Sequence, residues 1–136
     1  MPSEPFLGSI IPVGFNFAPR GYAFCQGQTM SIAQNTALFS LLGTTYGGNG
    51  QTTFALPDLR DVVPAHTGQG PGLSPLSLGE RSTRVLANGN GSASVAVARD
   101  MLASSSSASV AAPLDDEPQL AINYVIALQG VFPARN

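Results

Sequence analysis

The sequence predicts a mainly β (α+β) single domain with short strands, one capped α-helix and a projecting β-hairpin of small residues. Large apolar residues stand at every second position from Leu120 to Leu128, which is the period of a β-strand. A helical pattern occurs once, in Ser31 to Leu42, and glycine-rich turns separate the short apolar runs elsewhere. A chain of 136 residues that is 43% hydrophobic has the size and the core-forming residues of one domain.

The first half of the chain contains three expected strand regions. Phe6 to Phe17 is apolar and β-branched, which predicts one or two strands, and Pro12 places that segment at a sheet edge or a bend. Tyr22 to Phe24 predicts a second short strand. Thr52 to Phe54 predicts a third, which Pro57 ends.

The helix is expected over residues 31–42. Ser31 is an N-cap candidate, and Gln34, three residues later, completes a capping box. Gly43 is placed to end the helix. The apolar side is typical of a helix that packs on a core; it is formed by Leu38, Phe39, Leu41 and Leu42.

The stretch TTYGGNGQTTFALP, Thr44 to Pro57, resembles a phosphate loop only at first sight. Such a loop needs a lysine and precedes a helix, whereas this chain has no lysine and these glycines follow the helix. The alternative is a rigid turn in which several glycines adopt positive φ. The structural turn residues are expected to be Gly47, Gly48, Asn49, Gly50, Pro57, Asp58 and Arg60. Asp58 can accept hydrogen bonds from nearby backbone amides, and Arg60 can pair with Asp58 or Asp61.

Charge and reactive residues argue against an enzyme and against several partners. A net charge of −2 is too small to attract nucleic acid, and no apolar run is long enough for membrane insertion. Cys25 is expected to be a small buried residue, and His66 a structural or surface histidine. The acidic run Leu114-Asp115-Asp116-Glu117 is expected to be a solvated turn and not a calcium site. We therefore expect no catalytic residue, cofactor or metal.

The most individual segment is Val85 to Ala112, which predicts a flat hairpin with a turn at Asn88-Gly89-Asn90-Gly91. Both faces of Ser92 to Arg99 are small, and Ser104 to Ala112 is either a second such strand or a linker. Flat strands of small residues have weakly specified register, which suits assembly. The candidate contact residues for assembly or a ligand are Asn88, Asn90, Ser92, Ser94, Val95, Val97, Arg99, Ser105, Ser107 and Ser109.

The C-terminal strand is expected to bury one face, formed by Leu120, Ile122, Tyr124, Ile126 and Leu128, and to pair with the Phe6 to Phe17 segment. Three regions result. Residues 1–84 form a base, 85–118 a variable hairpin insertion, and 119–136 a strand that completes the base.

Several ordered motifs resemble the phage tail collar domain family, which includes bacterial microcystin-dependent proteins. They are FAPRGYAFCQGQ (Phe17 to Gln28), QNTALFSLLGTTYGGNGQTTFALPDLR (Gln34 to Arg60), HTGQGPGLSPLSLGE (His66 to Glu80) and AINYVIALQGVFP (Ala121 to Pro133). The resemblance implies a tail-fibre-like structural domain that works as an oligomer, trimeric in phage fibres, and is not a catalyst.

The chain departs from the family pattern at several positions. The family usually has Asp-Gly in place of Gln26-Gly27, GGDG in place of Gly47 to Gly50, and LRGR in place of Leu59 to Val62. Many members carry a histidine pair after the position of Glu80, whereas here His66 is the one histidine, so no metal site is carried over.

These observations favour a non-catalytic structural subunit of a tail-fibre-like extracellular or virion assembly. The expected partner is a second copy of the chain, in a trimer or a filament held by β-strand contacts. The alternative is a receptor-binding adhesin module for glycan or another cell-surface group, such as a polysaccharide. The N-terminal MPSEPFLGSIIP lacks a basic leader, so we expect export by lysis or a dedicated route.

Overall fold

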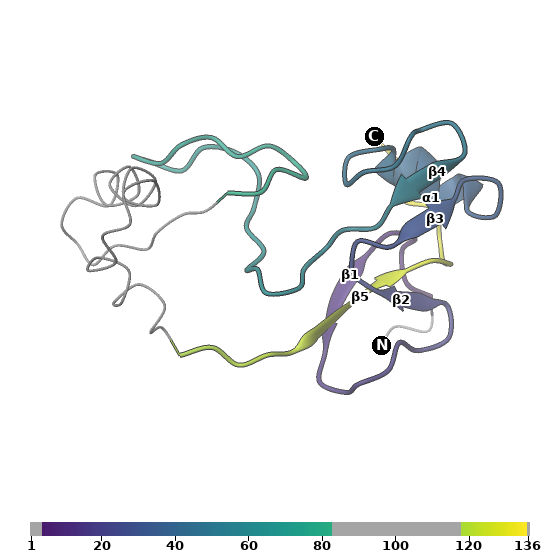
Figure 1. Ribbon diagram of the computed structural model, residues 1–136, viewed down its shortest axis with the longest axis horizontal. Helices are drawn as coiled ribbons and strands as arrows, with labels where there is room; N and C mark the ends of the chain where they lie inside the picture. Colours follow the sequence, from purple (N-terminus) through teal and green to yellow (C-terminus); the bar gives the residue numbers. More distant parts are fainter. Residues whose placement is uncertain (1–3, 83–117, 136) are drawn as a thin grey trace, which may run out of the picture. The chain divides into compact units, whose positions relative to one another are not determined.

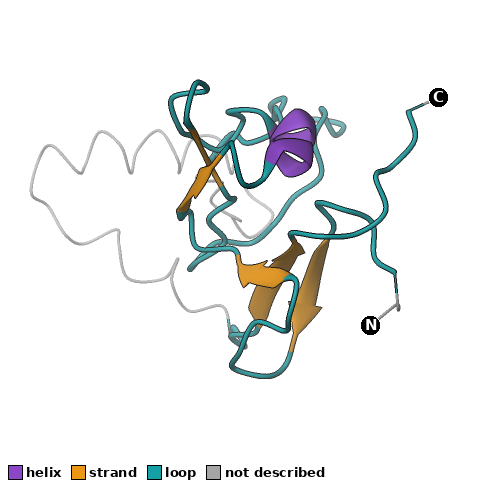
Figure 2. Ribbon diagram, turned by 90° about the vertical axis from the view of Figure 1, so that its right-hand side faces the viewer, coloured by secondary structure: helices purple, strands orange, loops and turns teal. Residues whose placement is uncertain are grey.

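The computed structural model describes residues 4–82 and 118–135 and confirms a mainly β architecture. Two small antiparallel sheets and one short helix make up the described elements (Figures 1 and 2). In chain order they are β1 (Ile10–Val13), β2 (Tyr22–Phe24), β3 (Thr29–Ser31), α1 (Thr36–Leu42), β4 (Thr53–Ala55) and β5 (Asn123–Ala127). The chain divides into two compact units, Met1–Glu80 with Ala121–Asn136, and Arg81–Leu120. All six elements belong to the first unit.

The larger sheet has the order β1-β5-β2, so the C-terminal strand lies between two N-terminal ones (Figure 1). Ile10 pairs with Ile126 and Val13 with Asn123, which confirms the expected pairing of the last strand with the early segment. On the other side of β5, Tyr22 pairs with Ala127 and Phe24 with Val125. Pro12 lies in β1, an edge strand, as expected of a residue that cannot donate to a ladder.

The expectation that β5 buries only one face is wrong in part. Ile126 is fully buried, but Leu120 and Ile122 on the same face are 88% and 46% exposed. The strand begins only at Asn123, so these two residues precede the ladder that would cover them. Val125 and Ala127, on the opposite face, are also fully buried, so this central strand is covered on both faces.

The second sheet pairs β3 with β4, through Thr29 with Ala55 and Ser31 with Thr53. This pairing corrects the predicted start of the helix, since Ser31 ends β3 and is not an N-cap. The next residue, Ile32, donates its N–H to the carbonyl of Thr52 at 3.0 Å, so the chain stays paired where a helix was expected.

Helix α1 begins at Thr36, with Asn35 at the N-cap position and no side-chain cap hydrogen bond. The Asn35 amide instead donates to the Ser31 carbonyl at 3.0 Å, which bridges the turn between β3 and the helix. The C-terminal end is as expected. Gly43 has φ 56° and donates its N–H to the carbonyl of Phe39.

The core joins both sheets and the helix. Its fully enclosed cluster is formed by Leu7, Cys25, Leu38, Phe54, Leu56 and Ile126. Phe39 of α1 packs on Phe54 of β4 with ring centroids 5.5 Å apart. Burial raises the pKa of the Cys25 thiol to about 11, so this cysteine is a neutral core residue at physiological pH.

We predict that Ile126→Ala lowers the free energy of unfolding by about 2–5 kcal/mol, because a fully buried side chain leaves a cavity. Ile122→Ala is the matched control on the same face, and its half-exposed side chain should cost less than about 1 kcal/mol. Urea unfolding followed by circular dichroism measures both. Equal losses for the two variants would contradict the packing described here.

Candidate functional site

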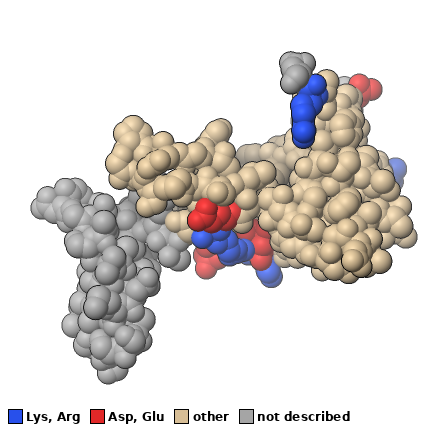
Figure 3. All heavy atoms as spheres, turned by 90° about the horizontal axis from the view of Figure 1, so that it is seen from above, with Lys and Arg blue, Asp and Glu red and all other residues tan. Residues whose placement is uncertain are grey.

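The described surface carries little charge, and most of the face in Figure 3 has no charged side chain. No polar or charged residue is buried in the part of the chain that the structure describes. The site residues predicted from the sequence that the structure describes lie at two places instead. One is the glycine turn that leads into β4, and the other is the segment that follows β4.

Asn49 organises the glycine turn. Its Oδ1 accepts the backbone N–H groups of Gln51, Thr52 and Thr53 at 2.8, 2.9 and 3.0 Å. Its Nδ2 donates to the Thr52 Oγ1 at 3.0 Å, and its own N–H donates to the Thr53 Oγ1 at 3.2 Å. One amide side chain thus satisfies most of the polar groups in the turn, which needs no bound phosphate to close.

Glycine is required here for space as well as for conformation. Gly47, Gly48 and Gly50 have φ values of 134°, 94° and 75°. A Cβ atom on Gly48 would lie 2.3 Å from the Cα of Phe54 and 2.6 Å from the Thr53 carbonyl oxygen. The turn therefore packs directly on the backbone of β4, whose Phe54 is part of the core.

The segment after β4 continues the pairing of the second sheet toward the first. Leu56 donates its N–H to the Gln28 carbonyl at 3.1 Å, and Leu59 donates to the Cys25 carbonyl at 2.9 Å. Between these two bonds, Gly27 donates its N–H to the carbonyl of the buried Pro57 at 3.1 Å. These bonds join the ends of β2 and β3 to one extended segment, so the two sheets are held in one unit.

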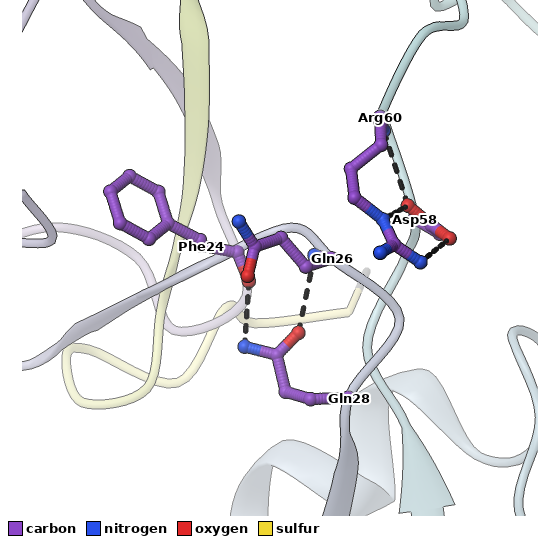
Figure 4. A network of polar contacts seen from close by, with 5 residues as sticks. All are labelled: Phe24, Gln26, Gln28, Asp58 and Arg60. Carbon is purple, nitrogen blue, oxygen red and sulfur yellow. Dashed lines mark hydrogen bonds and ion pairs between the residues drawn. The ribbon is translucent and has the colours of Figure 1, made fainter. Parts of the chain in front are cut away.

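Asp58 and Arg60 form a two-pronged ion pair beside this segment (Figure 4). Arg60 donates from Nε to Oδ1 at 2.8 Å and from Nη2 to Oδ2 at 2.7 Å, and its backbone N–H also reaches Oδ1 at 3.1 Å. The hydrogen bonds and charge of Asp58 raise the pKa of Arg60. Of the two partners considered for Arg60, the structure thus shows Asp58. Because the Arg60 side chain is 65% exposed, the pair orders the chain locally and adds little stability.

Gln28 covers part of the edge of β2, a role that the sequence analysis missed. Its Nε2 donates to the Phe24 carbonyl at 2.8 Å, and its Oε1 accepts the Gln26 N–H at 3.1 Å (Figure 4). Tyr22 donates its N–H to the Pro19 carbonyl at 3.0 Å. Nothing in the spacing of Gln26-Gly27-Gln28 indicates these contacts, because they depend on how the chain turns between the sheets.

The described residues hold no group of three His, Cys, Asp or Glu side chains that could bind a metal ion. No helix in this part of the chain has the length and apolar character needed to cross a membrane. His66 is exposed, with Nδ1 at 2.7 Å from the carbonyl oxygen of Thr67. Cys25 is buried and neutral. The geometry of these residues builds rigid turns and paired segments.

The expected contact residues of the hairpin, from Asn88 to Ser109, lie outside the described residues, as do Leu114 to Glu117. Their assignment stays a prediction.

Gly48→Ala is expected to destabilise the domain by roughly 2–4 kcal/mol, because the added Cβ meets backbone atoms and φ is positive. Gly14→Ala is the control, since a Cβ at Gly14 meets nothing within 4 Å. Thermal unfolding of the two variants compares them. A Gly48→Ala variant as stable as the wild type would show that the turn is free to move away from β4.

Asn49→Asp should make the stability depend on acid pH. The introduced carboxylate would accept the same three N–H groups, which lowers its folded-state pKa well below the ordinary value of about 3.9. The stabilisation is therefore present above that ordinary value and is lost as pH falls through the folded pKa. Urea unfolding is measured for the variant and for wild type at neutral and at strongly acid pH. Between these two pH values, the free energy of unfolding of the variant should fall by roughly 2 kcal/mol more than that of wild type. Parallel profiles of stability against pH for the variant and wild type would show that the side chain at position 49 does not accept the three N–H groups.

Comparison with known families bears directly on this base. Residues 8–64 match the family model described as Phage Tail Collar Domain, which confirms the resemblance over that part of the chain. The match spans less than half of the 136 residues, and the motifs from His66 to Glu80 and from Ala121 to Pro133 lie outside it. No curated protein matches the chain. Residues 8–64, which contain β1 to β4, the helix and the glycine turn, are thus similar to the phage tail collar domain, whose family consists generally of non-catalytic structural proteins with a tail-fibre-related role.

Proposed function

We propose that this protein is a non-catalytic structural subunit of a tail-fibre-like, virion-associated or extracellular assembly, and that it associates with copies of itself. The observation that carries the self-association is the amount of large apolar surface left exposed by so small a core. Among the described residues, the large apolar side chains that are at least 39% exposed are Phe6, Ile10, Phe15, Phe17, Val62, Val63, Leu73, Leu78, Leu120, Ile122, Val131 and Phe132.

Two groups of these side chains stand on well-tied backbone. Phe15 and Phe17 stack with ring centroids 4.7 Å apart, and the Asn123 side chain holds the Phe15 carbonyl at 2.8 Å. Phe6 pairs in parallel with Val131, where the N–H of Leu7 donates to the Val131 carbonyl at 2.9 Å. Aromatic side chains on ordered backbone lose little conformational freedom on association, and aromatic residues are enriched in interfaces.

Part of each edge of the larger sheet is closed to strand addition. Ala127 donates its N–H to the Ser9 carbonyl at 3.0 Å, so the backbone groups of Ser9 face β5. Because backbone groups alternate in direction along a strand, those of Ile10 and Pro12 face the outer edge. Pro12 supplies no N–H there, and on β2 two of the outward groups, the Tyr22 N–H and the Phe24 C=O, are already bonded to Pro19 and Gln28. We therefore assign strand-mediated contacts to the small-residue segment Val85 to Ala112, and side-chain contacts to the base.

Deletion of Asn88 to Ala112 should abolish or sharply reduce assembly and leave the base folded, because β1 to β5 contain none of these residues. Light scattering and negative-stain microscopy of full-length and deleted protein measure the assembly. Circular dichroism during thermal unfolding checks that the base survives the deletion.

A full-length chain that is monomeric at micromolar concentration would refute self-association. Unaltered oligomers of the deleted protein would instead place the contacts on the base, where Phe15→Ser and Phe17→Ser are the first variants to make.

A further inference from the structure

We propose that Asn49 is a latent self-modification site that stays an amide while its turn is closed and loses ammonia once the turn opens. Asn49 is exposed and is followed by Gly50, which has no side chain to hinder its backbone nitrogen. An asparagine in this setting is open to attack by the next backbone nitrogen. Nothing in the structural role proposed above requires or implies this chemistry.

The reaction is internal, and water is its co-reactant. The Gly50 nitrogen loses its proton and bonds to the Cγ of Asn49, and the Cγ–Nδ2 bond breaks to release ammonia. Water then opens the cyclic imide at either of its two carbonyl carbons. The product is an aspartate when the original main chain is restored, or an isoaspartate when the main chain passes through the former side chain.

The closed turn opposes the steps that lead to the cyclic imide. The Gly50 N–H is bonded to the Thr53 carbonyl at 2.9 Å, so its nitrogen is neither free nor easily deprotonated. The Asn49 Oδ1 is held by three N–H groups at 2.8–3.0 Å, and Nδ2 donates to the Thr52 Oγ1 at 3.0 Å. Because Asn49 is exposed, burial does not keep water away, and the hydrogen bonds are the protection.

Modification to isoaspartate would make opening of the turn irreversible. An isoaspartate inserts an extra carbon into the main chain at a turn that already packs on backbone, where a Cβ on Gly48 would lie 2.3 Å from the Phe54 Cα. It also removes the side-chain oxygen from the position at which it accepts three N–H groups. A chain modified in this way cannot rebuild the turn that supports β4.

The test compares one site in two states of the full-length wild-type protein. Folded protein and protein unfolded in urea are incubated in the same mildly alkaline buffer, and the mass gain at Asn49 is followed by peptide mapping. Asn88-Gly89 and Asn90-Gly91 give reference rates in the unfolded sample. We expect Asn49 to react at least about tenfold more slowly in the folded protein, equivalent to about 1.4 kcal/mol of protection. Equal rates in the two states would overturn the proposal.

A variant locates the protection within the turn. Thr52→Val removes the acceptor of the Asn49 Nδ2 and should speed the reaction in the folded protein by about fivefold, the effect of one exposed hydrogen bond. Ser40→Ala is the control, because it also removes one exposed side-chain hydrogen bond, from the Ser40 Oγ to the Ala37 carbonyl, but lies in α1. An unchanged rate in Thr52→Val, or an equal rise in Ser40→Ala, would contradict protection by the turn.

Discussion

The larger sheet depends on the insertion of β5 between β1 and β2. The two N-terminal strands do not pair with each other, and every ladder in this sheet includes a residue of Asn123–Ala127. Ile126 of the same strand also belongs to the central core cluster. The sheet and part of the core are therefore completed only when the distant end of the chain arrives, which makes the base a cooperative unit of long-range contacts.

This topology explains how the chain can carry a second unit, Arg81–Leu120, between the parts of its base. The entropic cost of closing a loop rises only slowly with its length, so the ladders of β5 tolerate long or short connections. Residues 8–64 and strand β5 together contain all the described strands and the helix, so the described fold is built without residues of the connection.

The sequence predicted the features of the fold that depend on local chemistry. Gly43 ends the helix as expected, and Pro12 lies at an edge. Ser31 and Gln34 satisfy the pattern of a capping box, but the pairing of Ser31 with Thr53 competes for the same backbone and prevails. Strand β3 has three residues and no periodic signal of its own, so only its partner reveals it. The exposure of Leu120 likewise depends on where its ladder begins.

The glycine turn depends both on local composition and on contacts that exist only in the folded chain. Its composition indicates positive φ, yet the need for glycine at Gly48 arises from β4, and the N–H groups that Asn49 binds become clear only from the folded chain. An amide at position 49 accepts these groups without introducing a charge. That choice agrees with a base whose described ion pair, Asp58–Arg60, stays at the solvated surface. Residues Gly47 to Gly50 contain no titratable side chain, so the hydrogen bonds that Asn49 makes do not depend on its protonation until the amide itself is lost.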